Sequence, residues 1–247
     1  MNASYEERLN RLCKAIDGGD VVFFGGAGVS TESGIPDFRS TDGLYHQEYA
    51  YSPETIVSRS FFDRNTDEFY RFYKDKMLFP NAKPNACHDA LAALEKCGKI
   101  NAVVTQNIDG LHQKAGSKRV YELHGSVWRN YCMCCKKGYT MSEIKASQGI
   151  PQCTCGGIIK PDVVLYEEGL DDNVVMGAVR EIAHAKTLII GGTSLVVYPA
   201  AGLVQYFHGE NLIIINRTPT SADVHADVCF MENLGKVFTD VMKQRGQ

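Results

Sequence analysis

Short runs of consecutive apolar residues recur along the chain, and amphipathic stretches separate them. The clearest runs are residues 21–24, 102–104, 188–190 and 212–215. Continuous apolar runs of this length are typical of parallel strands that are buried on both faces. Between them, residues 85–96 and 174–184 repeat apolar side chains at helical spacing. The alternation predicts an α/β fold with a Rossmann-like open parallel sheet.

A cluster of small and polar residues follows each apolar run. These clusters are residues 25–28, 106–109, 192–194 and 216–217. In open α/β sheets, ligands bind beyond the carboxyl ends of the strands. Because all four clusters fall at such ends, we expect them to line one shared ligand crevice.

Two stretches interrupt the alternation of strands and helices. Residues 45–85 are rich in aromatic side chains, and residues 127–165 hold a cysteine cluster. We expect both to be insertions that form a smaller lobe. The predicted Rossmann-like domain then comprises residues 1–44, 86–126 and 166–247, with 45–85 as a helical insertion and 127–165 as a zinc-binding module.

Composition and charge exclude several classes of protein. The 247 residues carry a net charge of −3, whereas nucleic-acid binders usually have a basic excess. No apolar run approaches the roughly 18 residues that span a bilayer. The N-terminus is polar and lacks the apolar core of a secretory signal. We therefore expect a cytoplasmic protein that binds neither nucleic acid directly nor a membrane.

Five of the nine cysteines lie close together in the sequence, between residues 132 and 155. A reducing compartment disfavours disulfides, so a local cluster indicates a metal site. We predict that Cys132, Cys135, Cys153 and Cys155 hold one structural zinc, because four thiolates leave no position for a catalytic water. Cys134 is an alternative ligand. A redox dithiol and a nucleic-acid zinc ribbon are rival interpretations, and the lack of basic charge disfavours the ribbon.

The glycine-rich cluster after the first strand is a weak signal by itself. Its glycines would let backbone N–H groups approach a pyrophosphate, but Thr31 stands where the dinucleotide fingerprint has a third glycine. A stronger signal comes from five motifs taken together. They are GAGVSTESGIPDFR at 26–39, TQNIDGLH at 105–112, ELHG at 122–125, GTSL at 192–195 and INR at 215–217.

In their order and spacing these motifs resemble the sirtuin family of NAD-dependent protein deacylases, over essentially the whole chain. The resemblance implies that NAD is a co-substrate, that nicotinamide is released and that the acyl group of acyl-lysine passes to ADP-ribose. It implies acyl-lysine proteins as partners. The NAD-binding residues that it implies are Gly26, Ala27, Gly28, Thr31, Asp37, Phe38, Arg39, Gln106, Asn107, Ile108, Asp109, Gly192, Thr193, Ser194, Asn216 and Arg217.

The resemblance also assigns roles to individual residues. His124 matches the catalytic histidine of the family, and an unperturbed imidazole pKa near 6.5 suits a general base. Asn107 is expected to position the ribose or a water molecule. Phe38 would shield the reactive carbon of the ribose, and Arg39 would contact phosphate.

The segment after residues 160–161 is expected to bind the substrate. In the family such a segment, together with the one after Gly-Thr-Ser, pairs with the substrate backbone as an added strand. Here the substrate-binding residues would be Val164, Leu165, Tyr166 and Val196. Where the family often has Phe-Gly-Glu, this chain has Tyr166-Glu167-Glu168.

The acyl pocket is expected to be apolar. Family members that prefer succinyl- or malonyl-lysine have a Tyr-x-x-Arg pair on the helix that closes this pocket. Here Tyr70 is followed three residues later by Tyr73. We expect Phe62, Phe69, Tyr70 and Tyr73, or some of them, to line the pocket, and acetyl-lysine to be preferred over succinyl-lysine.

Other activities fit parts of this pattern. A mono-ADP-ribosyltransferase or a long-chain deacylase would use the same scaffold, and a non-catalytic NAD-binding module would not require His124 and Asn107. A dehydrogenase fits the glycine loop alone, but it gives no role to the motifs at 106–109 and 124–125.

Overall fold

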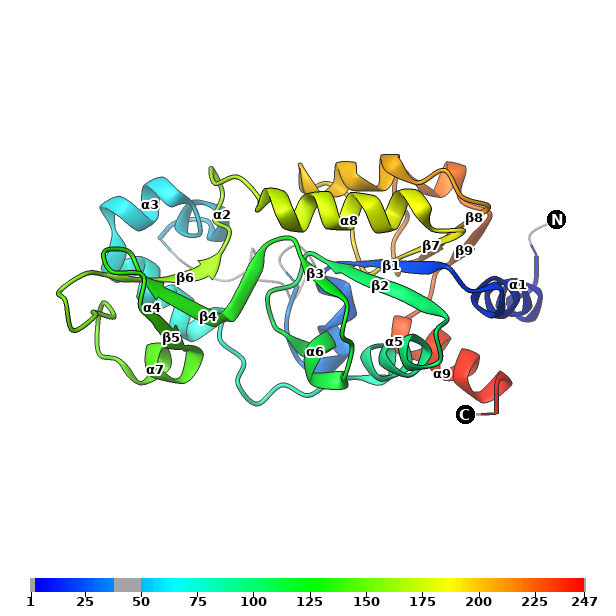
Figure 1. The fold of residues 1–247 in the computed structure, drawn as a ribbon, viewed down its shortest axis with the longest axis horizontal. Helices are drawn as coiled ribbons and strands as arrows, with labels where there is room; N and C mark the ends of the chain where they lie inside the picture. Colours follow the sequence, from blue (N-terminus) through cyan, green and yellow to red (C-terminus); the bar gives the residue numbers. More distant parts are fainter. Residues whose placement is uncertain (1–2, 38–49, 247) are drawn as a thin grey trace.

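A six-stranded parallel sheet forms the larger lobe of the protein (Figure 1). It is seen in a computed structural model that describes residues 3–37 and 50–246. The strand order is β3-β2-β1-β7-β8-β9, and every neighbouring pair is parallel. The strands are β1 (Val21–Gly25), β2 (Ile100–Thr105), β3 (Val120–Glu122), β7 (Thr187–Gly191), β8 (Asn211–Ile215) and β9 (Val228–Phe230).

Helices cover both faces of this sheet, as expected for strands that are apolar throughout. Along β1, Val21 and Phe23 belong to one core cluster, and Val22 and Phe24 belong to the opposite one. In Figure 1, α8 lies over one face and α5 and α9 lie over the other. The covering elements are α1 (Tyr5–Gly18), α5 (Ala86–Lys96), α6 (Leu111–Ala115), α8 (Asp172–His184), the 3-10 helix η4 (Ala200–Tyr206) and α9 (Leu234–Gln244).

The carboxyl ends of the four central strands lie at one edge of the sheet. Gly25 at the end of β1 is in register with Thr105 of β2 and with Gly191 of β7. Gly191 is in turn in register with Ile215 of β8. The loops that follow these strands are therefore neighbours, as the polar clusters after the apolar runs predicted.

The smaller lobe combines an antiparallel sheet with short helices. Its sheet has the order β5-β4-β6, formed by β5 (Gly138–Thr140), β4 (Gly125–Cys132) and β6 (Ile159–Val163). Its helices are α2 (Pro53–Ile56), α3 (Arg59–Arg64), α4 (Thr66–Lys76) and α7 (Met141–Ala146). One buried cluster joins residues from 56–78 with residues from 127–165, so both segments share a core.

Sequence patterns predicted the major strands and the helices between them, whereas β9 and the sheet of the smaller lobe were not predicted. Within the described residues, every helix is too short or too polar to cross a membrane.

Candidate active site

A cavity of about 520 Å³ opens between the loops at the carboxyl edge of the large sheet and the smaller lobe. It is lined by most of the residues that the sequence indicated, which are Gly26, Ala27, Gly28, Thr31, Asp37, Gln106, Asn107, Ile108, Asp109, His124, Val164, Leu165, Tyr166, Gly192, Thr193, Ser194, Asn216 and Arg217. Phe38 and Arg39 lie outside the described residues. Val196 is exposed, and its neighbour Val197 lines the cavity instead.

The loops after β1 and β7 touch each other through their backbones. The Gly28 N–H donates to the Gly192 carbonyl over 2.8 Å, and Gly192 adopts φ +61°. A Cβ at Gly192 would lie 2.5 Å from the backbone nitrogen of Val29. Glycine is therefore required on steric grounds, because it lets the two loops pack against each other and form one floor of the cavity.

A hydrogen-bonded chain extends across the floor to the loop after β8. The Gln106 side chain donates to Thr193 Oγ1 over 3.0 Å. The Thr193 N–H donates to Asn216 Oδ1 over 3.0 Å, and Asn216 Nδ2 donates back to the Thr193 carbonyl over 2.6 Å. Three separate polar clusters are thereby fixed relative to one another.

Ser30 organises the other half of the floor, and sequence reasoning did not single it out. Its buried hydroxyl donates to Asp109 Oδ2 over 2.6 Å and accepts from Asn107 Nδ2 over 3.1 Å. Burial raises the pKa of the Asp109 carboxyl, and the hydrogen bonds from Ser30 and from the Leu111 N–H oppose that shift. The indole N–H of Trp128 donates to the Asp109 carbonyl over 2.6 Å, another contact that no local motif indicated.

His124 follows β3 and lines the cavity. Its Nδ1 lies 2.9 Å from the Gln106 carbonyl, which only accepts hydrogen bonds, so Nδ1 carries the proton and the lone pair of the neutral ring is on Nε2. Burial lowers the pKa of His124, and the bond to Gln106 acts in the opposite direction. The neutral imidazole is therefore favoured near neutral pH, as a general base requires.

Four cysteine sulfurs gather in the smaller lobe, away from the cavity. Those of Cys132, Cys135, Cys153 and Cys155 all lie within 4.8 Å of one another, close to the roughly 3.8 Å sulfur spacing of a tetrahedral zinc site. Several hydrogen bonds, the largest contribution coming from the Cys155 N–H, lower the pKa of the Cys153 thiol to about 5. The donor set fits zinc and does not include Cys134.

The prediction for the walls of the acyl pocket was wrong. Phe62, Phe69, Tyr70 and Tyr73 do not line the cavity but pack inside the core of the smaller lobe, where the Tyr70 hydroxyl donates to the Ile159 carbonyl. The apolar side chains that do line the cavity include Met77, Phe79, Ile108, Val127 and Met141.

Comparison with known proteins shows which family the chain is similar to. The sequence profile of the Sir2 family matches residues 26–199. An NAD-dependent protein deacetylase of Clostridium perfringens is 58% identical over 242 residues, which are 96% of this chain and 99% of that protein. One from Staphylococcus aureus is 43% identical over 240 residues, which are 96% and 98% of the two chains.

Solved structures show the same similarity. The structure described as "Sir2-p53 peptide-NAD+" matches with a TM-score of 0.85 and 38% identity, and covers 96% of this chain and 98% of that one. The structure described as "Sir2 bound to acetylated peptide" matches with a TM-score of 0.84 and 37% identity over the same shares.

Proposed function

This chain belongs to the Sir2 family and is an NAD-dependent protein-lysine deacetylase, and from that premise we propose how its own residues carry out the reaction. The main support for this mechanism is the orientation of His124. Its Nδ1–H donates to the Gln106 carbonyl, so Nε2 is the basic atom of the ring. We assign His124 as the general base of acyl transfer.

The floor of the cavity has the features that NAD binding requires. Gly28 and Gly192 pack the loops after β1 and β7 tightly together, and small polar side chains such as Thr193 are held in fixed positions along the cavity. Gly26, Ala27, Gly28, Thr31, Asp37, Gly192, Thr193, Ser194, Asn216 and Arg217 would hold the pyrophosphate and adenosine half, together with Phe38 and Arg39. Bound NAD supplies the ADP-ribose that takes the acyl group and the nicotinamide that leaves.

The residues joined by Ser30 suit the nicotinamide half. A carboxamide needs one donor and one acceptor, and Asn107 and Asp109 offer both within a partly apolar wall that contains Ile108. Gln106, also fixed by a hydrogen bond, would complete this wall. Asn107 would orient the ribose or a water molecule, and His124 would accept a proton at Nε2 from a ribose hydroxyl.

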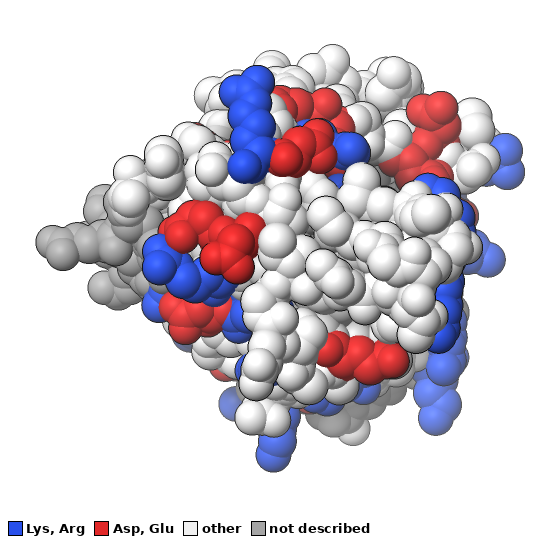
Figure 2. Space-filling view, turned by 90° about the vertical axis from the view of Figure 1, so that its left-hand side faces the viewer, with Lys and Arg blue, Asp and Glu red and all other residues white. Residues whose placement is uncertain are grey.

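Acyl-lysine proteins are the substrates. We propose that Val164, Leu165, Tyr166 and Val196 flank the lysine, with main-chain hydrogen bonds providing affinity that depends little on sequence. We propose that the protein does not bind nucleic acid directly. Figure 2 shows acidic and basic side chains interspersed around a wide uncharged area on the end of the smaller lobe, rather than one basic patch.

The zinc is structural, because its four thiolates would leave no open coordination position.

We propose that the chain is divided into a Rossmann-like domain of residues 1–44, 86–126 and 166–247, a helical insertion of 45–85 and a zinc module of 127–165. The core that residues 56–78 share with residues 127–165 supports grouping the two insertions in one smaller lobe. We propose the cytoplasm as the compartment, since a reducing environment keeps the metal-site cysteines as thiols.

The experiment that tests this function follows the fate of NAD. Purified protein is incubated with NAD and an acetyl-lysine peptide, and nicotinamide, deacetylated peptide and acyl-ADP-ribose are measured by mass spectrometry. Equal amounts of all three are expected. ADP-ribose attached to protein without loss of acetyl groups would indicate the transferase, and turnover confined to long-chain acyl peptides would indicate the long-chain deacylase.

His124→Ala tests the assigned base. We expect it to bind NAD and to lose about 10² to 10⁴ in the rate of acyl transfer, the usual contribution of a general base. NAD binding is measured by calorimetry and the fold by circular dichroism. Normal turnover by a folded, NAD-binding variant would disprove the assignment.

A further inference from the structure

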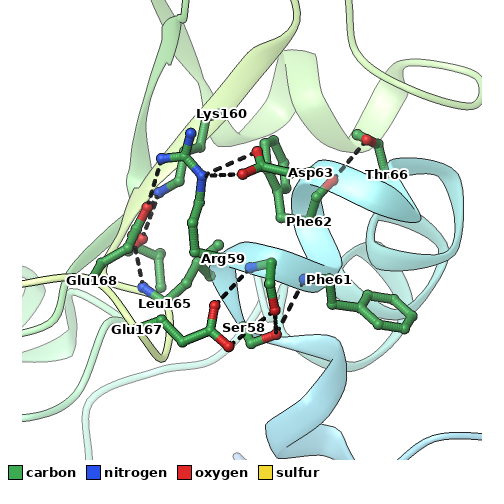
Figure 3. Close-up of polar contacts among 12 residues, drawn as sticks. Ser58, Arg59, Phe61, Phe62, Asp63, Thr66, Lys160, Leu165, Glu167 and Glu168 are labelled. Atoms are coloured by element: carbon green, nitrogen blue, oxygen red, sulfur yellow. Dashed lines mark hydrogen bonds and ion pairs between the residues drawn. The ribbon is translucent and has the colours of Figure 1, made fainter.

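Three charged side chains from three parts of the chain meet beside the proposed substrate-binding segment, and one of them, Glu168, also lines the cavity. Glu168, just after that segment, lies between Lys160 of β6 and Arg59 of α3 (Figure 3). Its Oε2 is 3.1 Å from Lys160 Nζ, and its Oε1 is 3.2 Å from Arg59 Nη1. The same Oε2 accepts the backbone N–H of Leu165 over 2.9 Å. One carboxylate therefore joins the helical insertion, the zinc module and the segment that lines the cavity.

Burial makes this contact more than a surface ion pair. Lys160 is 3% exposed, and its Nζ also donates to the Val163 carbonyl over 3.0 Å. Burial lowers the pKa of Lys160, and the charge of Glu168 opposes that shift. A buried charge that loses its partner is strongly destabilising, so Glu168 cannot move away from Lys160 without penalty.

The backbone of residues 164–166 is fixed at both ends as well. The Val164 N–H donates to the His124 carbonyl over 3.0 Å. The Tyr166 N–H donates to the Val57 carbonyl over 3.0 Å, and the Tyr166 carbonyl accepts from the Arg59 N–H over 2.9 Å. Since Glu168 holds the Leu165 N–H between these contacts, it fixes the middle of the segment that starts beside His124.

Glu167 reinforces the same connection. It has φ +76°, a backbone conformation that favours glycine. Its carboxylate accepts the Ser60 N–H over 2.8 Å and the Ser60 hydroxyl over 2.9 Å at the start of α3. The side chain thus ties the unusual backbone conformation to α3.

We propose that Glu168 is a positioning residue for the acyl-lysine peptide, and that Lys160 and Arg59 act through it to hold residues 164–166 in the shape onto which the peptide docks. This inference rests on the proposed substrate-binding role of those residues. The network touches neither the floor that would hold NAD nor the side chain of His124, so its loss should affect peptide binding selectively.

The test compares Glu168→Gln, Lys160→Met and Arg59→Met with the wild-type enzyme. Each should raise KM for an acetyl-lysine peptide at least about tenfold, with KM for NAD and kcat changed less than about threefold. Lys160→Arg keeps the charge and should restore most of the peptide affinity. Asp63→Asn is the matched control, because Asp63 pairs with Arg59 Nε but does not touch residues 164–168.

The double variant Glu168→Gln with Lys160→Met distinguishes the loss of the Glu168 contacts from the destabilisation caused by an unpaired buried lysine. Removing both charges avoids the unpaired buried lysine, so the double variant should bind peptide better than Glu168→Gln alone. If Glu168→Gln does not fold, Arg59→Met decides the question, because its side chain is 39% exposed. A folded Arg59→Met or Glu168→Gln enzyme with unchanged peptide KM would overturn the inference. A wild-type enzyme without peptide-dependent nicotinamide release would instead overturn the proposed function.

Discussion

His124 illustrates how one backbone contact prepares a side chain for catalysis. The Gln106 carbonyl fixes the proton on Nδ1, and burial lowers the pKa of the ring. Both effects favour a neutral ring with its lone pair on Nε2. Both effects depend on the pairing of β2 with β3. Gln106 directly follows β2 and His124 lies two residues after the end of β3, so the two residues are brought together at the edge of the sheet.

The lowered pKa of His124 predicts the pH dependence of the reaction. A protonated imidazole cannot act as a base, so kcat/KM should fall as the pH drops through the pKa of the free enzyme. Because that pKa is lowered, we expect the acidic midpoint to lie below about 6.5, the unperturbed value. Profiles from pH 5 to 8.5 at constant ionic strength would measure it. The exposed His208 provides a control, because His208→Asn should leave the profile unchanged, and an acidic midpoint above 7 would contradict the prediction.

The positions of cavity-lining residues were predictable from sequence where they depend on a local motif. The clusters at 106–109 and 192–194 each follow a strand directly, so their place at the edge of the sheet follows from chain order. Ser30 was not predictable in this way, because its role arises only when the loop after β1 meets the loop after β2. For the same reason the sequence did not predict the contact of Trp128, because its hydrogen-bond acceptor, the Asp109 carbonyl, lies 19 residues away in the sequence.

At the scale of elements, α4 shows why periodicity alone was insufficient. Its aromatic residues were correctly predicted to lie on a helix, but the sequence did not reveal which neighbour they contact. In the structure they pack in the core of the smaller lobe, in one cluster with residues of α2, α3, α7, β4 and β6. Similarly, β9 is three residues long, and the antiparallel sheet has mixed burial, so neither produces a continuous apolar run.

The arrangement of α4 still predicts acyl selectivity. Arg71 is an exposed partner of Glu68, and Lys74 donates to the carbonyls of Ser147 and Gly149, so neither cation reaches the cavity. A succinyl carboxylate would be buried without compensation in this apolar wall. We expect kcat/KM for a succinyl-lysine peptide to be at least about tenfold lower than for the acetyl form, or ~1.4 kcal/mol in the barrier.

Acetyl, butyryl and succinyl versions of one peptide would measure this selectivity. Lys76 does line the cavity, but it pairs with Asp75 over 3.1 Å. Lys76→Met should therefore leave the ratio of acetyl to succinyl activity unchanged. A preference for succinyl-lysine that disappears in Lys76→Met would show that this lysine recognises the carboxylate and would refute our prediction.

The zinc module makes a separate prediction about stability. One zinc per chain is expected, and Cys155→Ser should lose it, because metal-binding energy contributes directly to folding. A loss of several kcal/mol would lower Tm by roughly 10 °C in a protein of this size. Zinc content by mass spectrometry and Tm by calorimetry would measure both effects. Cys134→Ser is the matched control and should keep its zinc, since the Cys134 sulfur is outside the cluster; loss of zinc from this control would make Cys134 a ligand.

For the molecule as a whole, a pair of buried histidines beneath the large sheet should set the response to acid. His88 of α5 and His112 of α6 have ring centroids 4.7 Å apart, and both are buried. Burial lowers the pKa of His88 to about 4, and burial together with His88 lowers that of His112 to about 3. Both nitrogens of the His112 ring are buried without a hydrogen-bond partner. Protonation inside the fold is thus strongly disfavoured.

The sign of the pH effect follows from proton binding in the two states. Well above pH 6.5, the unperturbed pKa of histidine, both side chains are neutral whether the chain is folded or not, and the free energy of unfolding does not vary with pH through them. As the pH falls from there toward 4, the unfolded chain binds protons that the folded chain does not, which favours unfolding. At pH 5 the loss is on the order of 2 kcal/mol for each histidine. Together they should lower Tm by about 10 °C between pH 7 and pH 5.

His112→Phe isolates this contribution from that of the carboxylates. Phenylalanine keeps an aromatic ring beside Phe23 but cannot be protonated. The two histidines together account for part of the drop in Tm between pH 7 and pH 5, and we expect His112→Phe to remove about half of that part. This expectation concerns the difference between the two pH values and does not depend on the Tm of the variant at pH 7. The exposed His184 supplies the comparison, since His184→Phe should retain the full wild-type drop. An identical drop in wild type and His112→Phe would mean that acid unfolds the protein through other groups.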